Sequence, residues 1–424
     1  MFDVREKPKM VERALLVRVV FSSEELEKAP YLLLELEELV TTLGVGVVDS
    51  IAVKVRKPQA KFLVGTGKAE EVIELAKAQE CDIIIFDQSI SPAQQRNWEK
   101  DSDISVIDRQ EIILDIFSRR ARTREARLQV ELARMEYNLP RLQRAWTHLS
   151  RQRGGGAIQR GDGESQLELD QRMVRKRISA LKLELDKVVV HREVQRKRRM
   201  KLPIPTCSIV GYTNAGKSSL LNHLTESEVL VEDKLFATLD PTSRRLEMPS
   251  GKLLIVTDTV GFVRNLPHKL INAFKATLEE AILANFLIHV LDVSSPEVEE
   301  HYNTTLEVLK ELGADEIHRI TVFNKIDLCE DRAYLGELKA QYKDALFVSS
   351  LTGEGNEGLL KTIDALLVNE LIDVELLIPH DQYQYVSRLH DGGIISTQKH
   401  TDEGLILIGK FSPVISDIVK KFRI

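Results

Sequence analysis

One stretch of eight residues has the pattern of a phosphate-binding loop. It is Gly211-Tyr-Thr-Asn-Ala-Gly-Lys217-Ser218, which fits G-x-x-x-x-G-K-[ST]. In such a loop the glycines let backbone N–H groups surround a β-phosphate, and the following helix adds a positive dipole. Lys217 is then placed to reach the β- and γ-phosphate oxygens, and the Ser218 hydroxyl to ligate Mg²⁺. The strand-like run Thr206–Val210 and the helical run Ser218–Leu224 flank the loop and supply the context that this motif needs.

A second motif, Asp258-Thr-Val-Gly261, follows the strand-like run Leu253–Thr257. We expect Asp258 to hold Mg²⁺ through water. The Gly261 N–H can meet a γ-phosphate because no Cβ blocks the approach. The next residue is Phe262, where many such hydrolases carry a glutamine that orients the attacking water. Since Phe can neither donate nor accept that bond, intrinsic hydrolysis is expected to be slow and to need an external activator.

Two later motifs have the pattern of residues that bind the base of a nucleotide. Asn324-Lys-Ile-Asp327 follows one apolar run, and Ser349-Ser350 follows another. The Asp327 carboxylate can accept two N–H bonds from a guanine edge, which adenine does not offer, and Asn324 supports the pocket. The four motifs in this order, each at the carboxyl end of an apolar strand, predict a site for GTP and GDP.

Three positions refine this interpretation. Thr238 lies about twenty residues after Ser218, where a threonine hydroxyl can bind Mg²⁺ when the γ-phosphate is present and leave after hydrolysis. Thr242 competes for this role. In a subset of GTPases an asparagine at the position of Asn214 helps hold K⁺; the alternative, that Asn214 simply suits the loop backbone, stays open.

The expected site can be stated residue by residue. The catalytic residues are Lys217, Thr238 and Gly261, and the metal ligands are Ser218 and Thr238, with Asp258 acting through water. Nucleotide contacts are expected from Gly211, Tyr212, Thr213, Asn214, Ala215, Gly216, Lys217, Ser218, Phe236, Ala237, Thr238, Leu239, Asp240, Asp258, Thr259, Val260, Gly261, Asn324, Lys325, Ile326, Asp327, Ser349, Ser350 and Leu351.

Length and composition limit the class of protein. A chain of 424 residues is too long for one ordinary core, so two to three domains are expected. No run of about eighteen apolar residues predicts a membrane span, and the charged amino terminus does not resemble a secretory signal. The three cysteines, Cys81, Cys207 and Cys329, are far apart in apolar stretches. They are typical of reduced core thiols in a cytoplasmic protein.

Charge is distributed unevenly along the chain. The net charge is −6, yet residues 119–201 contain 23 Lys/Arg against 10 Asp/Glu. A basic region in an otherwise acidic protein suggests a polyanionic partner that touches this region alone.

The elements that must position these residues indicate an α/β, multidomain protein. Residues 1–108 alternate strand-like and helical runs, which favours an α/β domain with a parallel sheet. We expect a helical hairpin in 109–200, a P-loop GTPase domain in 201–372 and a small α+β domain in 373–424. Gly65-Thr-Gly-Lys68 lacks the first glycine and the hydroxyl of a second phosphate loop, and is interpreted as a glycine turn into a helix.

The basic region has the pattern of two long helices with a glycine-rich break between them. Leucine-rich heptad seams run from Leu128 to Leu142 and from Val174 to Val188, which predicts an antiparallel helical hairpin. Pro140 should kink the first arm near its end. A solvated coiled coil with a flexible turn is the plain alternative. Three consecutive glycines flanked by arginines favour nucleic-acid contact instead, with RNA-binding residues Arg151, Arg153, Gly154, Gly155, Gly156 and Arg160.

These motifs together resemble the HflX family of ribosome-associated GTPases, in the Obg–HflX superfamily. The resemblance covers nearly the whole chain. It implies GTP hydrolysis stimulated by the ribosome, binding to the large ribosomal subunit and, in some members, separation of stalled ribosomes under stress. It also implies that the glycine-rich loop reaches toward the peptidyl transferase centre. The segments that carry it are Gly211–Ser218, Phe236–Thr242, Asp258–Phe262, Arg160–Glu168, Ile113–Thr123 and Phe62–Lys68.

The sequence departs from the family pattern in three places, and two rival functions stay open. Asp162 stands where the family usually has Pro, and Ala157-Ile158 where it tends to have a further glycine, which leaves the loop conformation open. Ser349-Ser350 replaces the usual Ser-Ala, although the Ser350 N–H could still serve guanine O6. The rivals are a GTPase that assists tRNA modification or ribosome assembly, and a nucleotide switch that recruits a protein partner. We expect a free monomer that associates with ribosomes.

Overall fold

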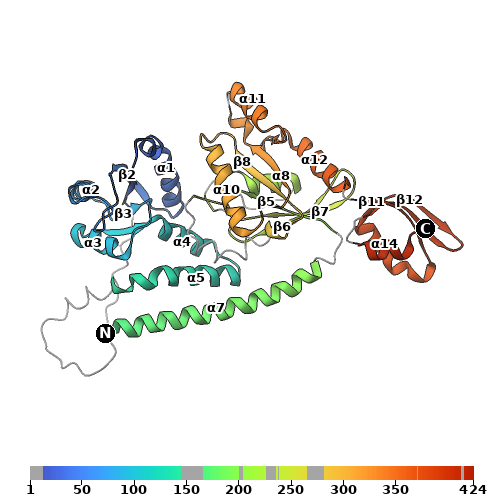
Figure 1. Cartoon of the computed structure of the whole chain (residues 1–424), viewed down its shortest axis with the longest axis horizontal. Helices are drawn as coiled ribbons and strands as arrows, with labels where there is room; N and C mark the ends of the chain where they lie inside the picture. The colour runs from blue at the N-terminus through green and yellow to red at the C-terminus, as the bar shows by residue number, and fades with distance from the viewer. Residues whose placement is uncertain are drawn as a thin grey trace. The chain divides into compact units, whose positions relative to one another are not determined.

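The computed structural model describes residues 13–144, 166–199, 204–225, 235–236, 238–264, 281–329, 331–369, 371–411 and 415–424. The glycine-rich loop, with Arg151, Arg153, Gly154, Gly155, Gly156 and Arg160, lies outside these residues, as does Ala237. The chain divides into two compact units, one up to Leu185 and one from Asp186 onward. The fold class is α/β with several parts, as predicted (Figure 1). No helix among the described residues is long and apolar enough to cross a membrane.

The first unit opens with a four-stranded parallel sheet in the order β2-β1-β3-β4. Its strands are β1 (Arg13–Val20), β2 (Gly46–Lys54), β3 (Ile83–Phe86) and β4 (Ser105–Asp108), joined by α1 (Ser23–Thr42), α2 (Thr66–Ala78) and α3 (Pro92–Ser102). On one face, Leu15, Val17 and Val19 of β1 share an apolar core with α2 and α3. Successive strand residues point to opposite faces, so buried Leu16 belongs to the other face. The run Ala14–Val17 is apolar and buried throughout because this strand is covered on both sides.

The glycine segment before α2 forms no second phosphate loop. Gly65 is the N-cap of α2, which begins at Thr66, as the turn interpretation predicted. Side chains cap the N-termini of the neighbouring helices α1 and α3. The Ser22 side chain accepts the Glu25 N–H at the start of α1, and Ser91 and Gln94 form a capping box on α3.

The first helical arm is shorter than its sequence suggested. The run after β4 is divided into α4 (Arg109–Arg120) and α5 (Arg124–Asn138), because Ala121 is extended and Thr123 caps the next helix by accepting the Ala126 N–H. α4 buries Ile113 and Phe117 and contacts α1, so it belongs to the body of this unit. Near Pro140 the helix does not simply kink: α5 ends at Asn138 and a 3-10 turn, Leu139–Arg144, follows.

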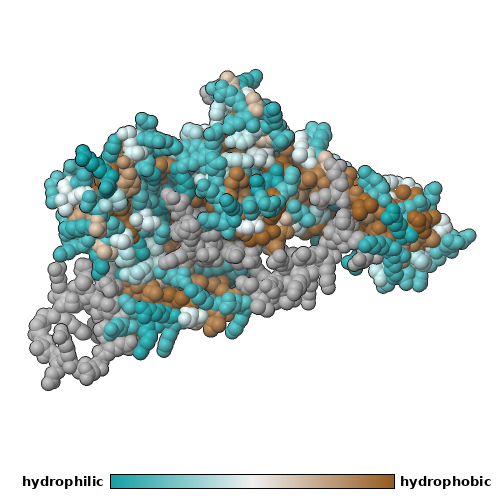
Figure 2. Space-filling view, in the orientation of Figure 1, coloured by the Kyte–Doolittle hydropathy of each residue, from teal (hydrophilic) through white to brown (hydrophobic). Residues whose placement is uncertain are grey.

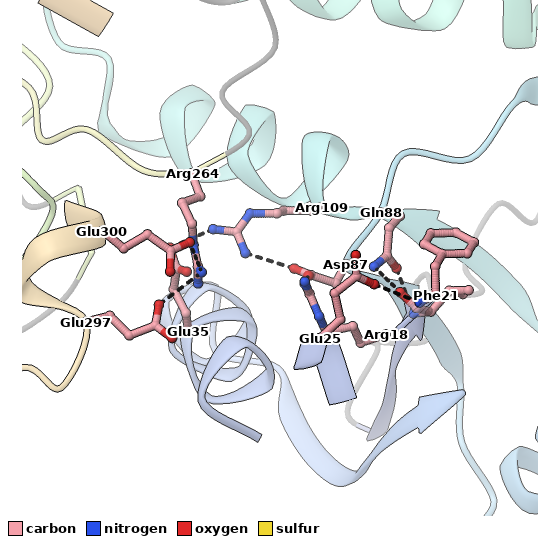
Figure 3. Close-up of polar contacts among 11 residues, drawn as sticks. Arg18, Phe21, Glu25, Glu35, Asp87, Gln88, Arg109, Arg264, Glu297 and Glu300 are labelled. Atoms are coloured by element: carbon pink, nitrogen blue, oxygen red, sulfur yellow. Dashed lines mark hydrogen bonds and ion pairs between the residues drawn. The ribbon is translucent and has the colours of Figure 1, made fainter. Parts of the chain in front are cut away.

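Polar contacts fix the end of α5 to the carboxyl edge of the sheet. Tyr137 donates to Asp108 at 2.9 Å, and the Arg141 guanidinium contacts both Asp108 and the Ile90 carbonyl at 3.4 and 2.8 Å. Nearby, the buried Arg109 pairs with Asp87 and Glu35 at 2.9 and 2.7 Å (Figure 3). Buried charges are tolerated when they are paired. These contacts therefore hold the start of α4 and the end of α5 against the carboxyl edge of the sheet.

The second arm is the long helix α7 (Gln166–Arg199), which contains the predicted seam from Val174 to Val188. Its predicted seam is the less exposed side: Ile178 and Leu181 are buried, and Val174 is half-buried. Ion pairs join it to α5, including Arg177 to Glu131 and Lys182 to Glu136, both at 2.7 Å. Figure 2 shows the apolar strip between α5 and the first part of α7, with hydrophilic side chains on the outer side of α7. The outer residues Arg172, Arg175 and Lys176 are exposed.

The second unit contains a six-stranded sheet in the order β10-β9-β8-β5-β7-β6. Its strands are β5 (Thr206–Gly211), β6 (Thr242–Glu247), β7 (Leu253–Asp258), β8 (Phe286–Asp292), β9 (Arg319–Asn324) and β10 (Leu346–Phe347). All neighbours are parallel except the edge pair β6 and β7. The helices are α8 (Lys217–Thr225), α10 (Val298–Leu312), α11 (Arg332–Gln341) and α12 (Asn356–Asn369). Since the carboxyl ends of parallel strands meet at one edge, this sheet brings the four motifs together.

The last part of the chain is a three-stranded antiparallel sheet in the order β11-β13-β12. Its strands are β11 (Ile372–Ile378), β12 (Gly393–Thr401) and β13 (Gly404–Phe411), with α13 (Val386–Asp391) and α14 (Ser416–Phe422). Leu376, Leu407 and Phe422 are among the residues of its core. These strands and helices agree with the small α+β composition that was predicted for the end of the chain.

A buried histidine in the six-stranded sheet makes the stability of the second unit depend on pH. His289, in β8, is fully buried and stacks on Tyr302 at 5.1 Å, and neither ring nitrogen has a partner among the described residues. Burial lowers the pKa of His289 to about 3 from its ordinary 6.5. The folded form therefore keeps this ring neutral, while the unfolded chain binds a proton below about pH 6.5. The resulting stability is present above that pH and is lost as the pH falls.

We expect His289→Phe, which keeps a stacking ring, to remove this dependence. Between pH 7 and pH 4.5 the parent should lose about 3 kcal/mol more unfolding free energy than the variant. Urea unfolding of both proteins at both pH values measures the difference, and the groups that titrate in both proteins cancel. Equal losses in parent and variant would show that His289 is hydrated or protonated in the fold.

Candidate nucleotide site

The phosphate loop connects the central strand β5 to α8. Gly211 ends β5 and Lys217 begins α8, so the loop backbone and the helix N-terminus face the same edge. Lys217 is buried, and its Nζ donates to the Tyr212 carbonyl at 2.7 Å. Burial lowers the pKa of Lys217 to about 8, partly offset by the nearby Asp258 carboxylate. Phosphate oxygens beside this amine would favour its charged form, which suits a phosphate-binding lysine.

Three oxygen-bearing side chains meet at the start of α8. The Ser218 hydroxyl donates to Asp258 Oδ2 at 2.6 Å and lies 2.9 Å from the Thr238 hydroxyl. Asp258 Oδ1 is buried without a hydrogen-bond partner among the described residues, and burial raises the pKa of Asp258. Hydroxyl and carboxylate oxygens are what Mg²⁺ prefers, so these residues fit such an ion. Thr242, the competing threonine, lies instead in β6, in register with Asp258.

The segment after Asp258 is bonded to the phosphate loop. The Thr213 N–H donates to the Phe262 carbonyl at 2.7 Å, and the Phe262 N–H donates to the Gly211 carbonyl at 3.0 Å. A Cβ at Gly261 would lie 2.8 Å from Thr213 Cα and 3.0 Å from Lys217 Nζ. Only glycine therefore fits between these groups. The Phe262 ring itself is buried, so it occupies the core and not the site.

Helix α10 holds both of these segments through side chains. Tyr212 stacks on His301 with ring centroids 3.7 Å apart, and the Tyr212 hydroxyl accepts the Arg264 N–H at 3.0 Å. The Arg264 guanidinium bonds Glu297 and Glu300 at 3.2 and 3.1 Å (Figure 3). The sequence interpretation missed this cluster. Tyr212 lies within the loop motif and Arg264 follows Phe262 by two residues, and neither position has a spacing that indicates a contact with α10.

The base-binding motifs lie beside the phosphate loop. Asn324 donates to the Ala215 carbonyl and accepts the Ser350 N–H, both at 2.9 Å, so it ties three segments together. A Cβ at Gly216, whose φ is +88°, would lie 2.2 Å from Asn324 Nδ2. Asp327 is exposed and available to a base. The Ser350 N–H, which the sequence assigns to guanine O6, is already engaged by Asn324.

A further ion pair at this edge was not expected. Lys325 has a left-handed backbone, with φ of 64°, and its Nζ pairs with Asp292 at the end of β8 at 2.7 Å. Asp292 ends its strand as Asp258 ends β7, which is the sequence signal that could have suggested it.

The other predicted positions have different environments. Thr259 is buried and donates its hydroxyl to the Ile209 carbonyl at 2.7 Å, which is a bond within the sheet. Asn214 is exposed with φ of 59°, a conformation that Asn tolerates and that agrees with the backbone interpretation as well as with an ion ligand. Buried side chains are found at Phe236, Leu239, Val260 and Ser349, partly buried ones at Asp240 and Ile326, and an exposed one at Leu351.

The cysteines agree in part with their predicted role. Cys81 and Cys207 are buried free thiols, and burial raises the pKa of both. Cys329 is a free thiol that is only partly buried. It therefore lies at the margin of the core.

Sequence comparisons find matches along most of the chain. Models of a GTP-binding GTPase N-terminal region, a GTP-binding GTPase middle region, a 50S ribosome-binding GTPase and an HflX C-terminal domain match residues 31–118, 120–199, 206–325 and 336–413. The GTPase HflX of Akkermansia muciniphila is 50% identical over 418 residues, covering 96% of each chain. That of Escherichia coli strain K12 is 40% identical over 406 residues, covering 95% of this chain and 94% of its own.

Among solved structures, a GTP-binding protein from the hyperthermophilic archaeon Sulfolobus solfataricus in complex with GDP is 24% identical. The alignment covers 84% of this chain and 98% of that one, with a TM-score of 0.42. The sequence relatives and the four matched models, and not this structural likeness, establish the family of the chain. The chain therefore belongs to the HflX family of GTPases, and its activity is the hydrolysis of GTP.

Proposed function

We propose that this GTPase binds the large ribosomal subunit, is stimulated by it, and splits or rescues stalled ribosomes under stress. The observation that carries the proposal is the replacement of a water-orienting glutamine by Phe262, whose ring is buried in the core. A site without that group needs an activator. The match to a model of a 50S ribosome-binding GTPase supports the ribosome as that activator.

In this proposal the phosphates rest on the loop backbone and the N-terminus of α8. Lys217 leaves the Tyr212 carbonyl and contacts the β- and γ-phosphate oxygens, and the Gly261 N–H contacts the γ-phosphate. Ser218 and Thr238 would hold Mg²⁺, with Asp258 acting through water. Magnesium, when bound, neutralises charge between the phosphates. Asp327 selects guanine, and Asn324 keeps the base loop against the phosphate loop.

The proposed RNA contacts lie in the hairpin. Arg151, Arg153, Gly154, Gly155, Gly156 and Arg160 of the loop reach rRNA, while exposed arm residues such as Arg172 and Arg175 face phosphates. The domain limits 108/109, 200/201 and 372/373 remain proposals. So do a free monomer and a cytoplasmic location in association with ribosomes.

Ribosome pelleting separates this proposal from its rivals. With a non-hydrolysable GTP analogue we expect the protein to sediment with large subunits, and with GDP or no nucleotide to stay mostly in the supernatant. Equal sedimentation with the GTP analogue, with GDP and without nucleotide would contradict the proposal. Binding to tRNA but not to ribosomal subunits would favour a GTPase that assists tRNA modification.

A second experiment concerns potassium. If Asn214 holds K⁺, single-turnover GTP hydrolysis should be faster in K⁺ than in Na⁺, by less than the acceleration that large subunits give. Asn214→Gly keeps the left-handed backbone and should remove the difference. Equal rates of the parent in both salts would remove the ion from the proposed mechanism and leave the ribosome proposal intact.

A further inference from the structure

Thr213 has a buried hydroxyl without a hydrogen-bond partner among the described residues. Its side chain is 6% exposed, although it belongs to a loop at the edge of the sheet. A buried hydroxyl normally finds a partner, because leaving it unpaired costs about 1–3 kcal/mol. The other loop polar groups that carry the proposed chemistry do have partners: Lys217 bonds Tyr212, and Ser218 bonds Asp258. We therefore expect a bound ligand to supply the hydrogen-bond partner of the Thr213 hydroxyl.

The position of Thr213 indicates which part of a nucleotide it faces. Its Cγ2 and the Lys217 Nζ both come within 3.0 Å of the point where a Gly261 Cβ would stand. Its own N–H is used, since it donates to the Phe262 carbonyl. Thr213 and the Lys217 amine thus both lie against Gly261, and Lys217 and Gly261 are the two groups proposed to contact the γ-phosphate. The hydroxyl is the donor of Thr213 that is left for a ligand.

We infer, on the basis of the proposed function, that the Thr213 hydroxyl donates a hydrogen bond to the terminal phosphate of GTP. This makes Thr213 a specificity-determining residue that separates GTP from GDP. GDP has no γ-phosphate, so it leaves this hydroxyl unpaired as in the present structure. The bond is charge-assisted, which is the stronger class of hydrogen bond. It adds a side-chain contact to a site in which Phe262 contributes none.

Thr213→Val tests the inference because it removes the hydroxyl and keeps both branches at Cβ. Binding of GDP and of a non-hydrolysable GTP analogue is measured by competition with a fluorescent GDP. We expect the variant to bind the analogue roughly ten- to hundredfold more weakly than the parent, with GDP affinity unchanged. Thr213→Ser, which restores the hydroxyl, should recover most of the difference.

The outcomes separate this inference from the function on which it rests. Equal losses for both nucleotides, or no loss for either, would overturn the role of Thr213, since a structural threonine does not distinguish them. A parent protein that binds neither nucleotide would overturn the guanine site itself. Thermal unfolding of the GDP-bound variants should match the parent, which confirms that the loop is intact.

Discussion

Replacing Asp327 with Asn is expected to weaken GTP binding by about a thousandfold and to improve binding of xanthosine triphosphate. The Asp327 carboxylate accepts two N–H bonds from guanine, and two hydrogen bonds to a charged group amount to about 4 kcal/mol. The amide presents a donor that repels this edge and suits the reversed edge of xanthine. Asp327 is exposed, so the change should not disturb folding. Competition binding with the two triphosphates measures the effect.

Asp344→Asn is the matched control. Asp344 is also exposed in this unit, but it precedes β10 and so lies toward the opposite end of the strands from the motifs. It should bind GTP like the parent. If Asp327→Asn also binds GTP like the parent, the base pocket is assigned to the wrong residue.

Deleting Gly154–Gly163 should abolish ribosome splitting while leaving the nucleotide site intact. The deletion removes the glycine-rich loop but keeps Lys217, Ser218 and Asp258, so nucleotide affinity and basal hydrolysis should stay within about twofold. Ribosome binding should weaken less than splitting, because basic residues on the arms, such as Arg172, still attract phosphates. Light scattering of dissociating ribosomes, measured beside a GTPase assay, follows both activities.

A second variant separates charge from shape in this loop. Changing Arg151, Arg153 and Arg160 to Ala keeps the glycines and removes three positive charges. The loss of ribosome binding relative to the parent should be larger at low salt than at high salt, because removing contacts to phosphates lowers the salt dependence of binding. A deletion variant that splits ribosomes at the parental rate would reduce the loop to a passive turn between two helices.

Much of the nucleotide site could be predicted because each motif is local. A loop such as Gly211–Ser218 contains its own turn, and the strand before it fixes which edge of the sheet it occupies. The order of motifs then brings Asp258 and Asn324 to the same edge, because the strands that they end are parallel. The heptad seam of α7 was predictable for the same reason, since helical periodicity is written into the sequence.

Contacts between distant segments could not be predicted. The stacking of Tyr212 on His301 and the Arg264 pairs join residues that no short-range pattern relates. The buried Arg109 likewise pairs with Glu35 and Asp87, which lie in other elements far from it in the sequence. The division between α4 and α5 was missed because Thr123 acts as a helix cap inside a run that also has helical composition.

Single-turnover hydrolysis of GTP, with and without ribosomal subunits, measures whether the ribosome is the activator of this site. Phe262 cannot orient the attacking water, so we expect slow hydrolysis by the protein alone. Purified large subunits should accelerate the reaction by at least tenfold at saturation, and small subunits should not. Hydrolysis that is equally fast with large subunits, with small subunits and with neither would contradict the account.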